Sequence, residues 1–129
     1  MTTHLVTVKE SLAAHGLGVF ANTALKKGSL IETCPLILVP IKDLEHIRNT
    51  KLYYYYFEYT DKQLAIMLGY GSLYNHSYTP NAKYIYNYKK KFVKVIAIKP
   101  IGKGEEIFFN YNFDPSDKQP LGDWFKTGY

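Results

Sequence analysis

The stretch of this sequence best suited to binding a ligand is the polar run at residues 71–81, which reads GSLYNHSYTPN. Asn75, His76 and Ser77 place three hydrogen-bonding side chains in a row, a composition that suits neither a core strand nor a solvated face. Pro80 biases the residue before it to an extended conformation and ends any helical turn. Alone, the run is compatible with a plain turn as well as with a site.

A second candidate is the glycine pair of Gly16-Leu17-Gly18. Two glycines let the backbone bend tightly or approach a ligand closely. The pair is not a dinucleotide-binding fingerprint, because no third glycine opens a helix after it. A hairpin turn remains the alternative interpretation of these residues.

Short strands separated by turn residues are the elements expected to position these two runs. A lysine-rich tip at residues 89–91 joins two apolar runs and predicts a β-hairpin. Gly28 and Gly104 each follow a lysine in two similar segments, and both segments predict a turn that leads into a strand. The two strands of the β-hairpin are predicted at residues 84–88 and 92–98. Further strands are predicted at residues 5–8, 36–39 and 107–111.

Helix is expected only in small amounts. Asp43 can cap a brief helix that ends near Arg48. The aromatic run at residues 52–59 favours a strand or an extended wall, and residues 64–68 are too few to distinguish strand from helix. The pattern therefore indicates a mostly β domain with one or two short helices.

The length, composition and net charge of the chain limit the classes of protein to which it can belong. A chain of 129 residues, 47% of them hydrophobic, is long enough for one domain with its own core. Cys34 is the only cysteine, so no internal disulfide and no zinc-binding thiolate cluster is expected. No signal peptide or membrane-spanning run is evident, which suggests an intracellular protein. The net charge of +5 suggests an acidic or nucleic-acid-bearing neighbourhood, although ordinary solubility explains it equally well.

Four motifs in one order resemble the SET-domain protein lysine methyltransferases, most closely the small stand-alone domains of viral and bacterial type. They are Gly16-Leu17-Gly18-Val19-Phe20, the run from Asn75 to Asn81, Gly104-Glu105-Glu106-Ile107 and Phe109-Asn110-Tyr111. The resemblance covers roughly residues 5–126. It implies a single SET domain over 1–129, with a core at about 5–113 and an aromatic tail at 114–129 that closes the cofactor site.

The fold implied by this resemblance is mostly β, the β-clip or SET fold. Several small curved sheets surround a threaded C-terminal segment, a pseudoknot that general rules of topology would not predict. The strand through Tyr111 should then pack against the segment of Asn75 and His76.

The reaction implied is transfer of a methyl group from S-adenosylmethionine to a lysine ε-amine. Alignment of the reacting atoms can supply about 7–11 kcal/mol of the barrier. An aromatic channel disfavours the ammonium form by desolvation, so no dedicated base is required. A sequence that is 16% aromatic has the residues for such a channel.

The family's site residues transfer position by position. Tyr111 matches the catalytic tyrosine, whose hydroxyl lies near the transferring methyl group. Trp124 falls where related domains place an aromatic ring over the adenine, and Phe125 could serve instead. The cofactor-binding positions are Gly16, Leu17, Gly18, Asn75, His76, Tyr111 and Trp124.

Three further positions match the substrate channel. Tyr56 aligns with a channel tyrosine, with a register uncertain by one or two residues because residues 53–56 are all tyrosine. Phe109 lies where the family controls the number of methyl groups added, and phenylalanine there favours higher methylation. Tyr84 lies where some members supply a tyrosine, which favours the opposite outcome. The methylation state stays open.

The sequence also departs from the family and leaves alternatives. Cysteine-rich zinc-binding flanks are missing, so the tail or a second subunit must finish the channel, and a homodimer is one hypothesis. The expected partner is a protein presenting a lysine, such as a histone, another chromatin protein or a ribosomal protein, met in the cytoplasm or nucleus. A catalytically silent SET-like binding module is the alternative. A nucleic-acid binder, suggested by interleaved lysines and tyrosines at residues 83–94, is disfavoured because no RNA-binding motif is present.

Overall fold

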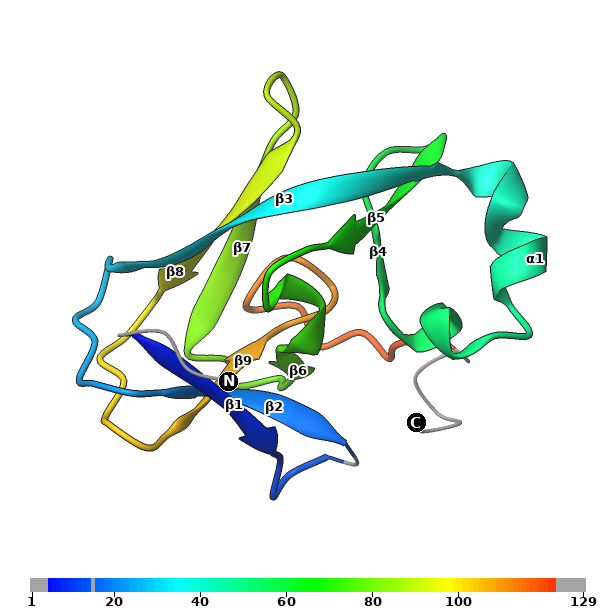
Figure 1. Cartoon of the computed structure of the whole chain (residues 1–129). Helices are drawn as coiled ribbons and strands as arrows, with labels where there is room; N and C mark the ends of the chain where they lie inside the picture. The colour runs from blue at the N-terminus through cyan, green and yellow to red at the C-terminus, as the bar shows by residue number, and fades with distance from the viewer. Residues whose placement is uncertain (1–4, 15, 123–129) are drawn as a thin grey trace.

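Two small sheets form the frame of the described chain, which comprises residues 5–14 and 16–122 of this computed structural model (Figure 1). The strand order is β1-β2-β9-β6 in the first sheet and β4-β5-β3-β8-β7 in the second. The strands are β1 (Val6–Glu10), β2 (Leu17–Ala21), β3 (Leu30–Pro40), β4 (Tyr56–Glu58), β5 (Gln63–Met67), β6 (Asn75–His76), β7 (Ala82–Asn87), β8 (Phe92–Ala97) and β9 (Glu106–Phe109). The predicted mostly β architecture is confirmed.

Helical structure in the described residues is limited to single turns. The helices are η1 (Ile41–Asp43), α1 (Leu44–Ile47), η2 (Lys51–Tyr54) and η3 (Gly71–Leu73). Asp43 precedes α1 as predicted, but its side chain makes no capping hydrogen bond. The aromatic run expected to be extended begins instead as η2 and becomes strand only in β4. No helix in the described part of the chain is long and apolar enough to cross a bilayer.

The predicted hairpin forms from β7 and β8. Alternate residues of β7, Ala82, Tyr84 and Tyr86, are buried, as are Val93 and Val95 of β8. This period of two is what a sheet with one covered face requires. The hairpin thus places tyrosines of β7 on the inner side of the second sheet.

The longest strand, β3, connects the two halves of the second sheet. Its first half pairs with β8 and its second half pairs with β5, and the partner changes after Pro35. A proline cannot donate to a sheet, so it is tolerated at such a change of partner. The shorter strand predicted at residues 36–39 is therefore only the second half of β3.

The two Lys-Gly segments form corners that pair with each other. Gly28 and Gly104 both adopt positive φ values, +87° and +88°, which glycine reaches without a Cβ clash. Leu25 and Ile101, which precede these turns, exchange backbone hydrogen bonds of 2.8 and 2.9 Å. This pairing holds the first sheet against the β3–β8 end of the second.

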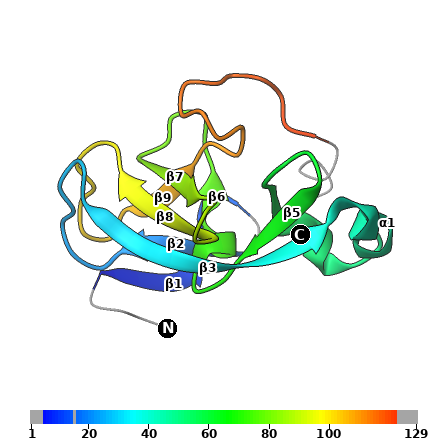
Figure 2. The same cartoon turned by 90° about the horizontal axis from the view of Figure 1, so that it is seen from above.

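The segment that follows β9 returns across the molecule on the side opposite β1 (Figure 2, orange). The Asn110 amide donates to the carbonyl of Asp117 at 2.6 Å, which folds the segment back on itself. The Tyr78 hydroxyl, just after β6, donates to the carbonyl of Gln119 at 2.9 Å. The end of the described chain is thereby tied to the polar run at residues 71–81.

Candidate active site

The polar run meets the last strand through a short parallel pair. Asn75 pairs with Phe108 and His76 with Phe109, and the Ser77 N–H donates to the Phe109 carbonyl at 2.8 Å. Every other strand pair described in the two sheets is antiparallel. We call the region where β6 meets β9, together with Tyr111, the β6–β9 crossing.

The buried Asn75 amide links three motifs of the sequence. Its Nδ2 donates to the Leu17 carbonyl at 3.0 Å and to Glu106 Oε2 at 2.8 Å. The other carboxylate oxygen of Glu106 accepts a 2.7 Å hydrogen bond from the Ser11 hydroxyl. A Cβ on Gly18 would lie 2.9 Å from Glu106 Cδ and 3.1 Å from Asn75 Nδ2, so any larger residue there would have to displace the Glu106 carboxylate.

Glu106 is the residue of this cluster that the sequence motifs do not single out. In the sequence it is one member of the Gly104-Glu105-Glu106-Ile107 motif, which predicts only a corner and a strand start. The sequence did offer one indication, a glutamate at the start of a predicted strand. A carboxylate that is not exposed on a sheet must accept hydrogen bonds from nearby donors.

The backbone beside Asn75 is left open by the sheet register. β9 pairs with Val19 and Phe20 of β2 but not with the residues before them. Leu17 is 47% exposed, and a Cβ built on Gly16 would meet nothing within 4 Å. A glycine-flanked strand end with free space beside it therefore adjoins the crossing, and its backbone could contact a ligand there.

His76 holds the backbone of Tyr111 in place through a hydrogen bond. Its Nδ1 accepts the Tyr111 backbone N–H at 3.0 Å. Burial lowers the pKa of His76 to about 4, so the ring is neutral at pH 7 and Nδ1 can act as an acceptor. The residue therefore acts here as a structural histidine, while its contact with a cofactor stays a prediction.

Tyr111 is held at both of its polar ends by the same short segment. Its N–H is bound by His76, and its hydroxyl donates to the backbone carbonyl of Tyr74. Its ring meets the edge of Phe57 at a centroid distance of 5.3 Å. Because the hydroxyl proton is used on Tyr74, the oxygen lone pairs of the phenol remain able to accept hydrogen bonds or face positive charge.

Tyr111 also lines two separate hollows, and it is the one described residue common to both. The smaller hollow, about 10 Å³, has room for about one water. Its wall is formed by Leu17, Tyr54, Tyr55, Ser72, Leu73, Asn75 and Tyr111. It lies where the glycine-flanked strand end meets the crossing.

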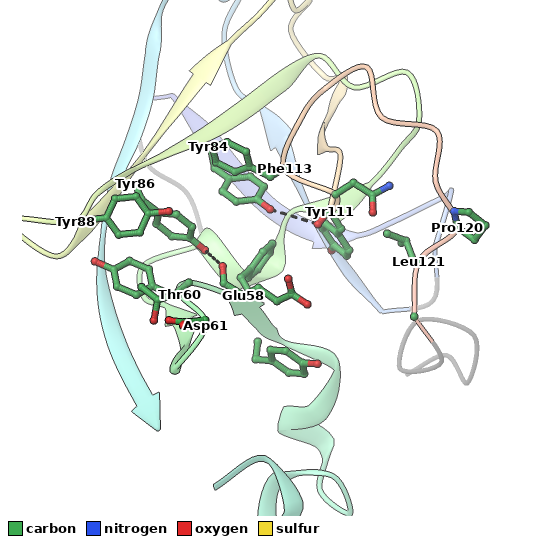
Figure 3. A pocket seen from close by; sticks show the side chains of 15 residues that line it. Glu58, Thr60, Asp61, Tyr84, Tyr86, Tyr88, Tyr111, Phe113, Pro120 and Leu121 are labelled. Atoms are coloured by element: carbon green, nitrogen blue, oxygen red, sulfur yellow. Dashed lines mark hydrogen bonds between the residues drawn. The ribbon is translucent and has the colours of Figure 1, made fainter. Parts of the chain in front are cut away.

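The larger hollow, which we call the aromatic pocket, has a volume of about 590 Å³ (Figure 3). Its lining residues are Tyr56, Phe57, Glu58, Tyr59, Thr60, Asp61, Tyr84, Tyr86, Tyr88, Tyr111, Asn112, Phe113, Pro120, Leu121 and Gly122. In Figure 3, Tyr84 and Phe113 lie near Tyr111, whereas Tyr86, Tyr88, Thr60 and Asp61 gather at the other end. The pocket is therefore walled mainly by rings of β4, β7 and the segment after β9.

Two of the three predicted channel residues line this pocket. Burial raises the pKa of Tyr84 and of Tyr56, so both phenols are neutral. The Tyr84 hydroxyl makes a long 3.5 Å contact to the Tyr111 carbonyl. Phe109 is fully buried and does not line the pocket; it stacks on Tyr74 at 4.5 Å and supports Tyr84 at 5.0 Å. Its control of methylation state stays a prediction.

The described structure thus brings together most of the predicted cofactor positions, namely Gly16, Leu17, Gly18, Asn75, His76 and Tyr111. Trp124 and its alternative, Phe125, lie outside the described residues, so their predicted place over an adenine stays a prediction.

Comparison with known proteins agrees with this arrangement. A family model described as SET domain matches residues 16–112, three quarters of the chain. A histone-lysine N-methyltransferase of Schizosaccharomyces pombe, described as specific for lysine 37 of H3, is 26% identical over 97 residues, which cover 74% of this chain and 66% of that protein. The chain therefore spans just under two thirds of the length of that relative.

A solved structure gives the same result for the fold. A Plasmodium falciparum protein described only as a candidate histone methyltransferase superimposes with a TM-score of 0.68 and 30% identity, over 85% of this chain and 95% of that one. Because the family model matches three quarters of the chain and a solved structure shares its fold at 30% identity, the chain belongs to the SET-domain family.

Proposed function

We propose that this protein is an S-adenosylmethionine-dependent protein-lysine N-methyltransferase. The observation that carries the proposal is the position of Tyr111, which lines both the hollow beside the glycine-flanked strand end and the aromatic pocket. A transferase of this type needs its methyl donor and its lysine on two sides of one point. Membership of the SET family and the names of its relatives support the same reaction class.

Different residues of the chain would bind the methyl donor and stabilise the reacting groups. The backbone of Gly16, Leu17 and Gly18, with Asn75 beside it, would bind the donor. When bound, S-adenosylmethionine supplies a methyl group whose bond to sulfur breaks as the lysine nitrogen lone pair forms the new bond. Tyr111, held by His76 and Tyr74, would aim its oxygen lone pairs at the positive charge of the reacting groups.

The aromatic pocket would prepare the lysine. Its rings exclude water and disfavour the ammonium form relative to the neutral amine, which alone is nucleophilic. The Tyr111 hydroxyl is already a donor to Tyr74, so we assign it no role as a base. The lysine proton would leave to solvent before transfer.

The test is label transfer from methyl-labelled cofactor to a panel of histones, chromosomal proteins and ribosomal proteins. Tyr111→Phe should lower the rate by about 10²–10³-fold, the usual loss when one pre-organised polar group is removed from an active site. Thr50→Val is the control, because it also removes a hydroxyl that donates to a backbone carbonyl, and Thr50 lines neither hollow.

Two outcomes would contradict the proposal. Equal rates for Tyr111→Phe and the wild type would remove Tyr111 from the chemistry. No transfer to any protein, together with no cofactor binding by calorimetry, would favour the alternative of a catalytically silent SET module.

Several finer features are part of the same proposal. We infer that the substrate is a histone or another basic protein, by analogy with the names of the relatives, and that the protein acts in the cytoplasm or nucleus. We also retain Trp124 as the adenine cover and a homodimer as the assembly. Light scattering that shows only monomer would exclude the homodimer.

A further inference from the structure

The aromatic pocket extends well beyond Tyr111. Its volume of about 590 Å³ lies in the range of about 300–1,000 Å³ that holds drug-sized ligands. Tyr111, Tyr84 and Phe113 surround one end, where the reacting lysine would enter (Figure 3). The other end, with Tyr86, Tyr88, Thr60 and Asp61, has no part in the proposed methyl transfer and needs its own explanation.

Three tyrosine rings form the wall of this far end. Tyr59 lies 4.9 Å from Tyr86 and 4.9 Å from Tyr88, and Tyr86 lies 5.5 Å from Tyr88. Tyr59 and Tyr86 are buried, and Tyr88 is 55% exposed. The Tyr86 hydroxyl donates to the Glu58 carbonyl at 3.1 Å, which links β7 to the end of β4. The rings are thus fixed in place and present aromatic surface to the pocket.

Two carboxylates line the aromatic pocket, Asp61 at its far end and Glu58 between its two ends (Figure 3). Glu58 and Asp61 are exposed and line the pocket. In the part of the chain described here, no lysine or arginine nitrogen lies within 4.0 Å of either carboxylate. Lys62 and the lysines at 89–91 are exposed like the two carboxylates, so water screens all of these charges, but the lysines do not line the pocket whereas Glu58 and Asp61 do. The pocket of a chain with net charge +5 thus carries a local negative edge.

Tyr59 supplies an independent observation. More than nine tenths of this residue is buried, it lines the pocket, and its hydroxyl has no hydrogen-bond partner among the described residues. Burial raises the pKa of Tyr59, so the group is a neutral phenol. A buried polar group without a partner is rare in proteins and calls for an explanation, and a bound ligand or water at the Tyr59 hydroxyl is the one that a pocket-lining position favours.

We propose that the far end is a subsite for a second cationic side chain of the substrate, an arginine or lysine a few residues from the lysine that is methylated. This inference rests on the proposed function and specifies its substrate class. Aromatic faces attract cations, arginine most often, and nearby carboxylates add a screened attraction. The combination of rings with Glu58 and Asp61 selects a basic peptide over a neutral one.

The test uses short fluorescent peptides with one central lysine and a single arginine moved through the neighbouring positions. Each peptide has a partner in which citrulline, a neutral isostere, replaces the arginine. Binding to the full chain is measured by anisotropy, and label transfer is measured in parallel. At one or two positions, arginine should bind about tenfold more tightly than citrulline, and added salt should reduce this ratio.

Variants locate the effect. Asp61→Asn and Glu58→Gln should each bring the arginine-to-citrulline ratio toward one, whereas Glu45→Gln, on the exposed α1, should leave the ratio at its wild-type value. A circular-dichroism melt confirms that each variant is folded. Equal binding of arginine and citrulline peptides at every position, or a ratio unchanged by both pocket variants, would overturn the subsite.

The two proposals fail in different ways. An arginine preference in binding without any label transfer would contradict the methyltransferase and support the subsite. Label transfer with no arginine preference would support the enzyme and overturn the subsite. Absence of binding by every peptide would overturn the subsite as well.

Discussion

The β6–β9 crossing is held by hydrogen bonds between polar groups far apart in the sequence, whereas the aromatic pocket beside it is walled by rings that meet mainly edge to face. In the crossing, Asn75 and Glu106 are 31 positions apart and bond at 2.8 Å. In the pocket, Tyr84 contacts Phe57 at 5.3 Å and Tyr86 at 5.7 Å, both in edge-to-face geometry.

This difference predicts which of the two regions tolerates amino-acid substitutions. A hydrogen bond between buried groups requires a donor at one position and an acceptor at the other, and loss of either costs about 1–3 kcal/mol. Packed rings require area and shape, and volume-conserving changes usually cost less than about 1.5 kcal/mol. The crossing should therefore be intolerant of near-isosteric substitutions that the pocket accepts.

The largest expected effect on stability is that of Asn75→Asp. The new carboxylate cannot donate to the Leu17 carbonyl, and it adds a buried negative charge beside Glu106. We expect a loss of about 3 kcal/mol in the free energy of unfolding, measured by urea denaturation. Asn87→Asp is the control, because the side-chain oxygen there accepts the Lys90 N–H and an aspartate still can. Equal losses for the two variants would contradict the polar account of the crossing.

Gly18→Ala tests the close packing in the same region. The added methyl would displace the Glu106 carboxylate, which Ser11 and Asn75 hold in place. Overpacking of this kind costs about 1–3 kcal/mol and should also weaken cofactor binding measured by calorimetry. Gly102→Ala should have little effect, since a Cβ there comes no nearer than 3.4 Å to Glu105. A Gly18→Ala protein as stable as wild type would show that Glu106 moves freely.

The crossing should also weaken in acid because of His76. Its pKa is lowered by burial from 6.5 to about 4, so the unfolded chain binds the proton more readily than the folded one. The stabilising contribution is complete above pH 6.5 and falls as the pH drops toward 4. We expect about 1 kcal/mol, a value reduced for solvent screening of this half-buried ring.

The measurement is denaturant unfolding between pH 7 and pH 4.5. His76→Asn should show a shallower decrease over this window than wild type, whereas His46→Asn, at an exposed histidine of α1, should follow wild type. Parallel curves for wild type and His76→Asn would exclude His76 as the cause.

The smallest effect is expected in the pocket, for Tyr84→Phe. Only the long 3.5 Å contact to the Tyr111 carbonyl is lost, while the ring and its packing against Phe57 and Phe109 remain. The change in the free energy of unfolding should stay below about 1 kcal/mol. A loss as large as that of Asn75→Asp would remove the contrast between the two regions.

Local patterns in the sequence predicted the antiparallel hairpin of β7 and β8 and the turns at Gly28 and Gly104. In each case the deciding residues are close together, and alternation or a positive φ is enough. The same reasoning failed for the start of the aromatic run, where η2 replaces an extended wall, because four consecutive tyrosines carry no periodicity.

The site could be predicted from the sequence only through the resemblance of its ordered motifs to the SET family. Asn75, His76 and Tyr111 were identified as members of one site in this way, and the structure brings them together. The role of Glu106 and the second end of the aromatic pocket were not predicted. Both depend on contacts between segments that no local pattern connects.

By itself, then, the sequence determined the strand-rich class, the turns and the identity of the polar and aromatic residues, because these depend on neighbours along the chain. Only the tertiary structure decided that β6 and β9 run parallel, that Glu106 binds both Ser11 and Asn75, and that Tyr111 lines two hollows. The physical reason is that a short parallel pair forms only after the chain between its strands has folded, so no local preference can specify it.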